Sequence, residues 1–249
     1  MHQLLIATNN KGKIKELQEL LSDTGIQLVT PAQIHLDLDV VEDGLTYEAN
    51  AAKKAAAFAH ASGLISLADD SGLEVDALGG APGLYSARYG SDLALPPVSA
   101  SPKMEGVGGG PLSDGGRRNY LVQQLQDKPR PWTARFHATI AIAIPNHVTL
   151  SEAKDLGENQ AQTLQVLHFP GATYKDGTEI SLAEGFCQGE IIPEERGTGG
   201  FGYDPIFLLP ELGKTMAELT MDEKNRLSHR ARAVMNAKPT LERLFSQSG

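Results

Sequence analysis

Apolar positions in the first sixty residues predict one strand and two helices. Residues 4–7 form a short apolar run, so residues 3–7 are predicted to form a buried strand, and apolar residues then recur at helical spacing over 14–21. Residues 46–61 are rich in alanine and contain no helix breaker before Gly63, so they predict a second helix. The first strand and the first helix are therefore joined by a short polar turn at residues 8–13.

A second buried strand is predicted at residues 65–68. This apolar run ends abruptly at Asp69, Asp70, Ser71 and Gly72, a sequence typical of an exposed loop. We therefore expect two adjacent carboxylates just beyond the end of a strand.

The second half of the chain contains a clear strand pattern and three helix signals. Apolar residues alternate over 134–144, which predicts a strand, and residues 117–126 are expected to form a short helix. Thr220 and Glu223 have the spacing of a capping box, so a helix is expected to begin there. The last helix should end before Pro239 or be kinked there.

Two regions have few residues that could build a core. Residues 91–116 are rich in proline, glycine and serine, and we interpret them as a mobile insertion. Residues 145–178 are polar and variable, with at most one strand near 164–169. We expect residues 1–249 to form a single domain that carries these two segments.

Charge, hydropathy and cysteine content argue against a nucleic acid partner, a membrane span and an internal disulfide. The chain has 249 residues with a formal net charge of -9, which disfavours a nucleic acid polymer as partner because basic phosphate contacts dominate such binding. The sequence contains no apolar stretch of about 18 residues, so we expect no membrane span. Cys187 is the single cysteine, which excludes an internal disulfide and suits a reducing cytoplasm.

The turn at residues 8–13 has the chemistry of a phosphate-binding site. It offers a hydroxyl, two amides, backbone N–H groups and two ammonium groups before a helix. Lys54 lies four residues after Asn50, so both side chains would share one helix face. An ordinary polar loop and a solvated helix surface are the alternatives for these two features.

The adjacent carboxylates Asp69 and Asp70 predict a cation site. Crowded carboxylates are unfavourable unless a cation or strong donors compensate them. Glu42 is a candidate third ligand, and an all-oxygen ligand set suits Mg²⁺ better than zinc or copper. The alternative is a capped turn, because Asp-Ser-Gly is also common turn chemistry.

Residues 197–202 match the G-x-G-x-x-G pattern of dinucleotide-binding turns. The context argues against that interpretation, because Pro205 falls where the required helix needs an amide donor. The glycines instead indicate close approach to the backbone. Phe201 and Tyr203 could supply rings for a flat base, although such residues often pack inward.

Basic residues gather between Lys224 and Arg230. On one continuous helix Lys224 and His229 would point about 140° apart. Ser228 is a good N-cap, so we expect a break there, which would let Lys224, His229 and Arg230 converge on one ligand. A basic helix surface is the alternative.

In their order along the chain, these segments resemble the inosine triphosphate pyrophosphatase family. The resemblance excludes only residues 91–116 and roughly 145–178. The motifs that carry it are Ala-Thr-Asn-Asn-Lys-Gly-Lys at 7–13, Glu-Asp-Gly-Leu-Thr-Tyr at 42–47, Ala-Asp-Asp-Ser-Gly-Leu at 68–73, Gly-Ala-Pro-Gly-Leu-Tyr-Ser-Ala-Arg-Tyr at 80–89, Gly-Thr-Gly-Gly-Phe-Gly-Tyr-Asp-Pro-Ile-Phe at 197–207 and Ser-His-Arg at 228–230.

The resemblance implies roles for individual residues. Asp70 would be the general base, and Glu42, Asp70 and, as a further candidate, Asp69 would bind Mg²⁺, with Mn²⁺ as a substitute. Ala49 departs from the family pattern, which has an acidic residue there, and Glu48 is the candidate replacement. The residues implied to bind substrate are Thr8, Asn9, Asn10, Lys11, Gly12, Lys13, Lys54, Ser71, Phe201, Gly202, Tyr203, Asp204, Lys224, His229 and Arg230.

The resemblance also implies a fold and a reaction. The fold would be α/β and elongated, with two lobes, a mixed central sheet flanked by helices, and the active cleft between the lobes. The chain would hydrolyse ITP, dITP and XTP to the monophosphate and pyrophosphate, as a cytoplasmic homodimer. Two alternatives are a related pyrophosphatase for pyrimidine or modified nucleotides and a nucleotide-sensing module without turnover.

Overall fold

A computed structural model describes residues 3–91, 112–145, 172–173 and 177–246. Within these residues eight strands form one sheet with the order β2-β1-β3-β4-β6-β7-β8, and β5 pairs with β6. β1 pairs in parallel with β2 and β3, whereas the pairs β5–β6, β6–β7 and β7–β8 are antiparallel. The strands are β1 (Gln3–Ile6), β2 (Gln27–Val29), β3 (Ile65–Val75), β4 (Trp132–Ile144), β5 (Ala172–Thr173), β6 (Glu179–Ile191), β7 (Phe207–Leu209) and β8 (Lys214–Thr215).

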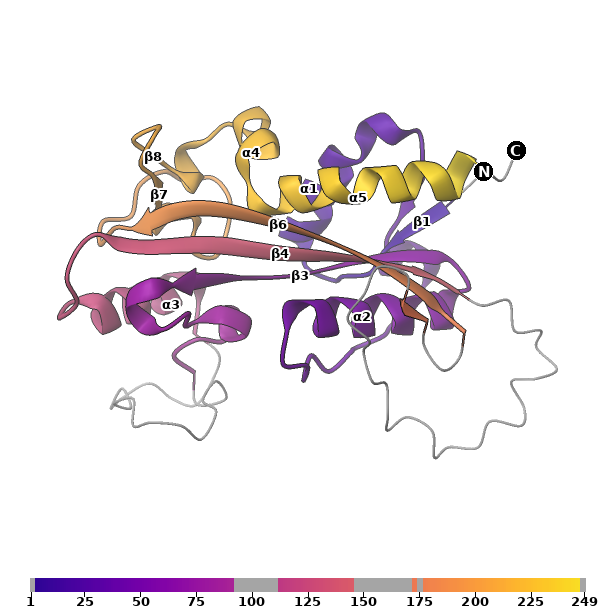
Figure 1. Cartoon of the computed structure of the whole chain (residues 1–249), viewed down its shortest axis with the longest axis horizontal. Helices are drawn as coiled ribbons and strands as arrows, with labels where there is room; N and C mark the ends of the chain where they lie inside the picture. Colours follow the sequence, from indigo (N-terminus) through magenta and orange to yellow (C-terminus); the bar gives the residue numbers. More distant parts are fainter. Residues whose placement is uncertain (1–2, 92–111, 146–171, 174–176, 247–249) are drawn as a thin grey trace. The chain divides into compact units, whose positions relative to one another are not determined.

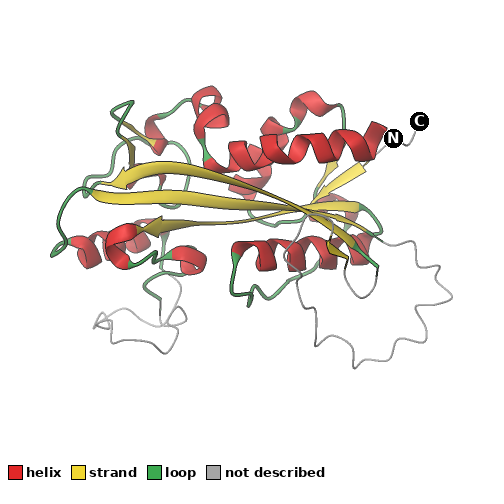
Figure 2. Cartoon of the chain, viewed as in Figure 1, coloured by secondary structure: helices red, strands yellow, loops and turns green. Residues whose placement is uncertain are grey.

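Helices flank the strands, as Figure 2 shows. The expected α/β class with a mixed sheet is therefore confirmed. None of the described helices is long and apolar enough to cross a membrane. The α-helices are α1 (Lys11–Leu20), α2 (Tyr47–Ser62), α3 (Asp114–Leu125), α4 (Met221–Leu227) and α5 (His229–Ser246), and the 3-10 helices are Ser22–Thr24, Pro31–Ile34, Asp76–Leu78, Gly83–Tyr85, Asp204–Ile206 and Met216–Glu218.

Several element boundaries differ from the sequence-based expectation. α3 begins at Asp114 with Ser113 as its N-cap, so the last residues of the expected insertion at 91–116 are helical. Residues 92–111 and 146–171, which include the strand expected near 164–169, lie outside the described residues. α5 continues past Pro239 to Ser246, so the first of the two expectations, that it ends before this proline, is wrong, and the expected kink there stays a prediction.

The largest correction concerns β3. It continues from Ile65 through Asp69 and Asp70 to Val75, where we expected an exposed loop. Asp69 is fully buried and Asp70 is 8% exposed. Two buried carboxylates can persist inside a strand only where cations or donors compensate them, and the site described below contains those cations.

The described chain groups into two compact units. The first comprises residues 1–71, 138–185 and 229–249, and the second comprises residues 72–137 and 186–228. In the first unit α1 and α5 cover one face of the strands and α2 covers the other (Figure 1). Alternation along β1 explains this layering, because Leu4 packs with the α1 and α5 core and Leu5 with the α2 core.

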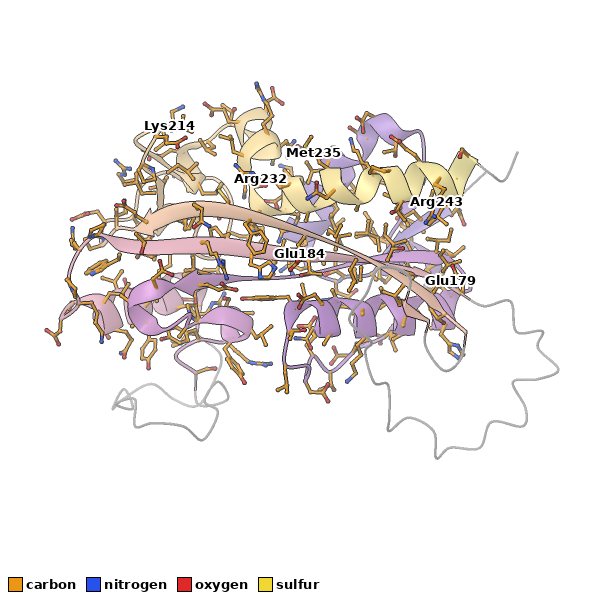
Figure 3. The ribbon with its side chains drawn as sticks, in the orientation of Figure 1. Glu179, Glu184, Lys214, Arg232, Met235 and Arg243 are labelled. Atoms are coloured by element: carbon orange, nitrogen blue, oxygen red, sulfur yellow. The ribbon has the colours of Figure 1, made fainter. Side chains whose placement is uncertain are left out.

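α5 is amphipathic, which explains how it covers the first unit. Figure 3 labels Arg232, Met235 and Arg243 along its length, and these three side chains are exposed. The helix contacts the strands through small and aliphatic residues, namely Ala231, Ala233, Val234, Ala237 and Leu241, all of which are buried. Buried residues on both sides of Pro239 hold the helix together where the proline removes one hydrogen bond.

The second unit has its own hydrophobic core. Leu121 and Leu125 of α3 pack with Trp132 of β4, which is the only tryptophan of the chain. The rings of Phe136 and Phe207 lie 4.4 Å apart between centroids in the same core. α3 is therefore anchored by apolar contacts, and its first turn carries polar side chains.

Candidate functional site

The polar turn after β1 is organised by its own side chains. Asn10 is the N-cap of α1, and its Oδ1 accepts hydrogen bonds from the backbone N–H groups of Gly12 and Lys13 at 2.9 and 3.1 Å. Thr8 Oγ1 accepts a third from the N–H of Asn10 at 3.2 Å. Asn9, Asn10 and Lys11 are exposed, so a ligand has access to this turn.

Four charged residues of the first unit form what we call the buried charge cluster: Glu16, Asp69 and Arg230, which are buried, and Lys13, which is half-buried. Lys13 Nζ lies 2.7 Å from Asp69 Oδ2, and Arg230 Nη2 lies 3.2 Å from the same oxygen. Arg230 also pairs with Glu16 through Nη1 and donates to Ser71 Oγ at 3.0 Å. The cluster ties α1, β3 and α5 together and supplies the cations that the buried Asp69 requires.

The electrostatics of this cluster follow from its geometry. Burial disfavours ionisation of Asp69, but the charges of Arg230 and Lys13 outweigh it and hold the pKa of the carboxyl well below its ordinary value. Burial also opposes the charge of Arg230, yet Asp69 and Glu16 raise the pKa of its guanidinium. Asp69 and Arg230 are therefore both charged at neutral pH.

The pKa of Asp70, the neighbour of Asp69, is shifted in the opposite direction. Burial raises its pKa above the ordinary value, the lysines Lys13 and Lys54 oppose that shift, and the carboxylates of Glu42 and Asp69 add to it. Its Oδ1 accepts a hydrogen bond from the N–H of Ser71 at 3.0 Å. Adjacent carboxyls thus have pKa values moved in opposite directions, a pattern typical of sites that use a proton acceptor.

Lys54 and Asn50 do not belong to a solvated helix surface, which was one of the two interpretations of their spacing. Both are buried on α2. Lys54 pairs with Glu42, and Asn50 Oδ1 accepts a hydrogen bond from the N–H of Gly44 at 2.7 Å. Two side chains of α2 therefore fix the segment that carries Glu42. Glu48 lies in the first turn of the same helix.

The glycine-rich loop at 197–202 belongs to the second unit and does not lead into an α-helix. It is followed by the 3-10 helix Asp204–Ile206 and then by β7, so the argument against a dinucleotide-binding turn is confirmed. Gly200 has φ +71°, and a Cβ atom there would lie 1.9 Å from Asp204 Oδ2. Any larger residue would displace that carboxylate.

Asp204 organises the residues around the loop. Its Oδ2 accepts from the N–H of Phe201 at 3.0 Å and from Lys224 Nζ at 2.8 Å. Both Asp204 and Lys224 are buried, and Lys224 Nζ lies 5.4 Å from the centroid of the Phe201 ring. One carboxylate thereby sets the positions of a cation and an aromatic ring.

Tyr203, which directly follows the loop, is fixed by a separate contact. Its hydroxyl donates to the carbonyl of Ser86 at 3.0 Å, and the side chain is buried. Burial raises the pKa of this phenol above its ordinary value, so it stays a neutral donor. Ser86 belongs to the 80–89 motif, which the structure thus links to residue 203.

Sequence reasoning missed three polar residues that hold this loop. Asp114 and Arg118 of α3 contact the backbone of Gly202, and Arg118 also forms a two-point ion pair with Glu195 at 2.8 Å for both contacts. No motif marked them, because a side chain that binds a distant backbone group leaves no spacing pattern in the sequence. The glycine content before α3 was the only signal, and it indicated an insertion.

The expected helix break is confirmed. Ser228 has an extended backbone between α4 and α5, and it is also the last residue of the second unit. Lys224 pairs with Asp204 in the second unit, whereas Arg230 pairs with Glu16 and Asp69 in the first. His229 is buried at the start of α5. The convergence of these three residues on one ligand stays a prediction.

These observations define an α/β protein in which a lysine–carboxylate cluster follows a strand–turn–helix unit, an arrangement suited to phosphate binding. Residues 4–240 match the Ham1 family. The chain belongs to that family.

Known proteins similar to this chain support the assignment. A dITP/XTP pyrophosphatase of Desulforamulus reducens is 41% identical over 244 residues, which cover 98% of this chain and 97% of that protein. A dITP/XTP pyrophosphatase of Bacillus subtilis is 37% identical, with 97% and 98% covered. The solved structure of a HAM1 protein from Coxiella burnetii is 30% identical with a TM-score of 0.69 and covers 100% of both chains. The resemblance inferred from the sequence motifs is thereby confirmed.

Proposed function

We propose that this member of the Ham1 family hydrolyses dITP, ITP and XTP to the monophosphate and pyrophosphate, with Asp70 as the general base. The chain is a hydrolase that acts on phosphoric anhydrides. The observation that carries the assignment of Asp70 is its environment: a buried carboxyl with a raised pKa, beside Lys13, Lys54 and a second carboxyl held in its charged form. A base poised in this way can accept the proton of an attacking water.

The first unit supplies the groups that bind phosphate. The charges of Lys13 and Lys54 both oppose the rise in the pKa of Asp70, so both ammonium groups lie near the proposed base. The turn at residues 8–13 adds amide, hydroxyl and backbone donors. Fixed donors of this kind stabilise the charge that develops on the leaving pyrophosphate.

Mg²⁺ fits the carboxylates of the first unit. The described residues contain no group of three or more His, Cys, Asp or Glu side chains that could hold a metal. Mg²⁺ is, however, commonly bound through one or two carboxylates together with substrate phosphates. Glu42 and Asp70 would hold it, and Asp69 Oδ1, which is buried and has no hydrogen-bond partner among the described residues, is a third candidate.

When bound, Mg²⁺ or Mn²⁺ supplies charge neutralisation for the triphosphate. The chain's own residues perform the remaining tasks. Asp70 orients and deprotonates water, Lys13 and Lys54 hold the phosphates, and Arg230 fixes Asp69 and Ser71. Arg230 acts through other residues in this proposal, because both of its terminal nitrogens already donate to Glu16, Asp69 or Ser71.

The second unit binds the base. Phe201 offers a ring face, and Lys224 and the N–H groups of the loop offer donors. Hypoxanthine and xanthine carry an oxygen acceptor at the six-position where adenine carries an amino group, so donors there favour the first two and leave adenine unsatisfied. Gly202, Tyr203 and Asp204 complete the proposed set in this unit, and His229 of the first unit is a further proposed substrate contact.

We further propose that the chain acts as a cytoplasmic homodimer. The homodimer has its support in the family resemblance, and the cytoplasmic location in the single cysteine of the sequence. Light scattering coupled to size-exclusion chromatography distinguishes a dimer from the 26.6 kDa monomer.

The decisive experiment is turnover of ITP, dITP, XTP, ATP, GTP and dTTP with Mg²⁺ and with excess EDTA. We expect pyrophosphate release from the first three, and only with the metal. Full turnover in EDTA contradicts the metal proposal. A preference for dTTP indicates the pyrimidine alternative, and binding without pyrophosphate release indicates a sensing module.

A further inference from the structure

Two side chains of α3 bind the backbone N–H and the carbonyl oxygen of Gly202. Asp114 Oδ2 accepts a hydrogen bond from the N–H of Gly202 at 2.7 Å, and Arg118 Nη1 donates to its carbonyl oxygen at 2.7 Å. Both polar groups of this peptide segment are therefore engaged by charged side chains. Hydrogen bonds to charged groups are shorter and stronger than those between neutral groups.

Arg118 is itself held in place. Its Nε and Nη2 form a two-point ion pair with Glu195 at 2.8 Å each, and its side chain is 14% exposed. The hydrogen bond from Arg118 lowers the pKa of the Glu195 carboxyl, which therefore stays charged. A planar guanidinium bound at two points has a fixed orientation, so its remaining donor points at one place.

Gly202 lies between two residues that are held by other contacts. Its neighbour Phe201 is fixed by Asp204, and Tyr203 is fixed by Ser86. Gly202 lies between them with φ +61° and has no side chain of its own to anchor it. Rotation at this glycine would turn the rings on either side relative to each other.

We propose that Asp114 and Arg118 are positioning residues for base recognition, which hold the Gly202 peptide and thereby the Phe201 ring in the conformation that binds the purine. The inference rests on the proposed assignment of Phe201 to Asp204 to the base. Because the base is bound alike in the ground state and the transition state, loss of this support raises KM and leaves kcat nearly unchanged.

The test compares variants that remove a contact with variants that preserve it. Asp114→Ala removes the acceptor, and we expect KM for ITP to rise about tenfold with kcat changed less than about twofold. Asp114→Asn keeps an acceptor oxygen, so its KM should stay within about threefold of the parent. Arg118→Met should behave like Asp114→Ala, and Arg118→Lys, which keeps one donor, should lie between the two.

Two controls separate positioning from loss of structure. Arg135→Met removes an arginine of the same unit that pairs with Glu74, and we expect neither KM nor kcat to change. The fluorescence of Trp132, which packs in the same core as α3, reports whether the helix stays folded in each variant. A folded Asp114→Ala variant with unchanged KM overturns the proposal, as does an Asp114→Asn variant as impaired as Asp114→Ala.

The Phe201→Ala variant distinguishes the assignment of Phe201 to the base from the positioning role of Asp114 and Arg118. If it raises KM for ITP but folded Asp114→Ala and Arg118→Met do not, the base assignment stands and the positioning role is overturned. If Phe201→Ala leaves KM unchanged, the base assignment fails, and the positioning role fails with it. A matching rise in KM for all three variants supports both.

Discussion

The two units use charged residues in different ways. In the first unit, Lys13, Asp69, Arg230 and Glu16 pair with one another in the interior. In the second, Asp114 and Arg118 use their charges on the backbone of a loop. The comparison shows that one site fixes side chains against each other and the other fixes the shape of a main-chain segment.

We therefore expect substitutions in the two units to change different kinetic constants. In the proposed mechanism, groups of the first unit face developing charge, so their loss should lower kcat, whereas groups of the second are assigned to the base, so their loss should raise KM. The five predictions below begin with the largest expected effect.

Asp70→Asn should lower kcat by about 10²- to 10⁴-fold, because the amide is nearly isosteric but cannot accept the proton. The thermal midpoint should change little, which circular dichroism checks. A variant with a near-normal rate would place the base elsewhere, with Asp69 and Glu42 as the next candidates.

The pH dependence of the parent enzyme provides a second check on Asp70. Its pKa is raised above the ordinary 3.8, so the protonated, inactive form persists to higher pH than for an exposed aspartate. The rate should therefore rise with pH along a limb that lies above 3.8 and then level off. A kcat/KM profile that is flat down to 3.8 contradicts this.

Asp69→Asn should lower the free energy of unfolding by about 3 kcal/mol, because it leaves buried cations with less compensation. The sign of the pH effect follows from the lowered pKa. The parent's extra stability is complete above 3.8, the ordinary pKa, and is lost as pH falls below it. Denaturant unfolding at about pH 7 and about pH 3 should show a smaller acid loss in the variant than in the parent. Equal losses would show that Asp69 is not the titrating group.

Lys54→Gln and Lys224→Gln form a pair that tests the division directly. Lys54→Gln should lower kcat about tenfold or more, because it removes a charge beside the phosphates. Lys224→Gln should raise KM for ITP about tenfold and change kcat less than about threefold, because its partners are Asp204 and the Phe201 ring. Initial-rate kinetics on ITP measure both. If both variants change kcat alone, or both change KM alone, the proposed assignment of kcat to the first unit and KM to the second is wrong.

Thr220→Ala should have the smallest effect. Thr220 Oγ1 accepts from the N–H of Glu223 at 3.2 Å in the capping box that begins α4. Loss of this cap should cost about 1 kcal/mol of stability, equivalent to about 2–4 °C in Tm, with kcat unchanged. A kcat that falls with the Tm would connect α4 to the chemistry.

The parts of the molecule that the sequence predicted well are those with a periodic or capping pattern. The helix at 46–61, the break at Ser228 and the capping box at Thr220 all follow from local rules. The continuation of β3 through Asp69 and Asp70 could not be predicted, because the local signal for a turn is overridden by cations from α1 and α5. Only the folded chain brings those cations to the strand.

The residues of the candidate site divide in the same way. In the first unit Lys13, Asp69 and Arg230 of the buried charge cluster were singled out and Glu16 was not. In the second unit Asp114 and Arg118 were both missed. Their partner Gly202 lies 88 positions after Asp114 and 84 after Arg118. A hydrogen bond to a backbone atom requires no particular residue type at the receiving end, so no complementary pair appears in the sequence.

The course of the long strands has a consequence for cooperativity. The chain passes between the units after Ser71, His137 and Gly185, which lie inside β3, β4 and β6, and after Ser228. Three of these four unit boundaries therefore lie inside a strand, where a linker between separate domains would be expected. Neither unit can be excised without cutting hydrogen-bonded strands, so we expect denaturant to unfold the chain in one transition, with Trp132 fluorescence and far-UV circular dichroism coinciding.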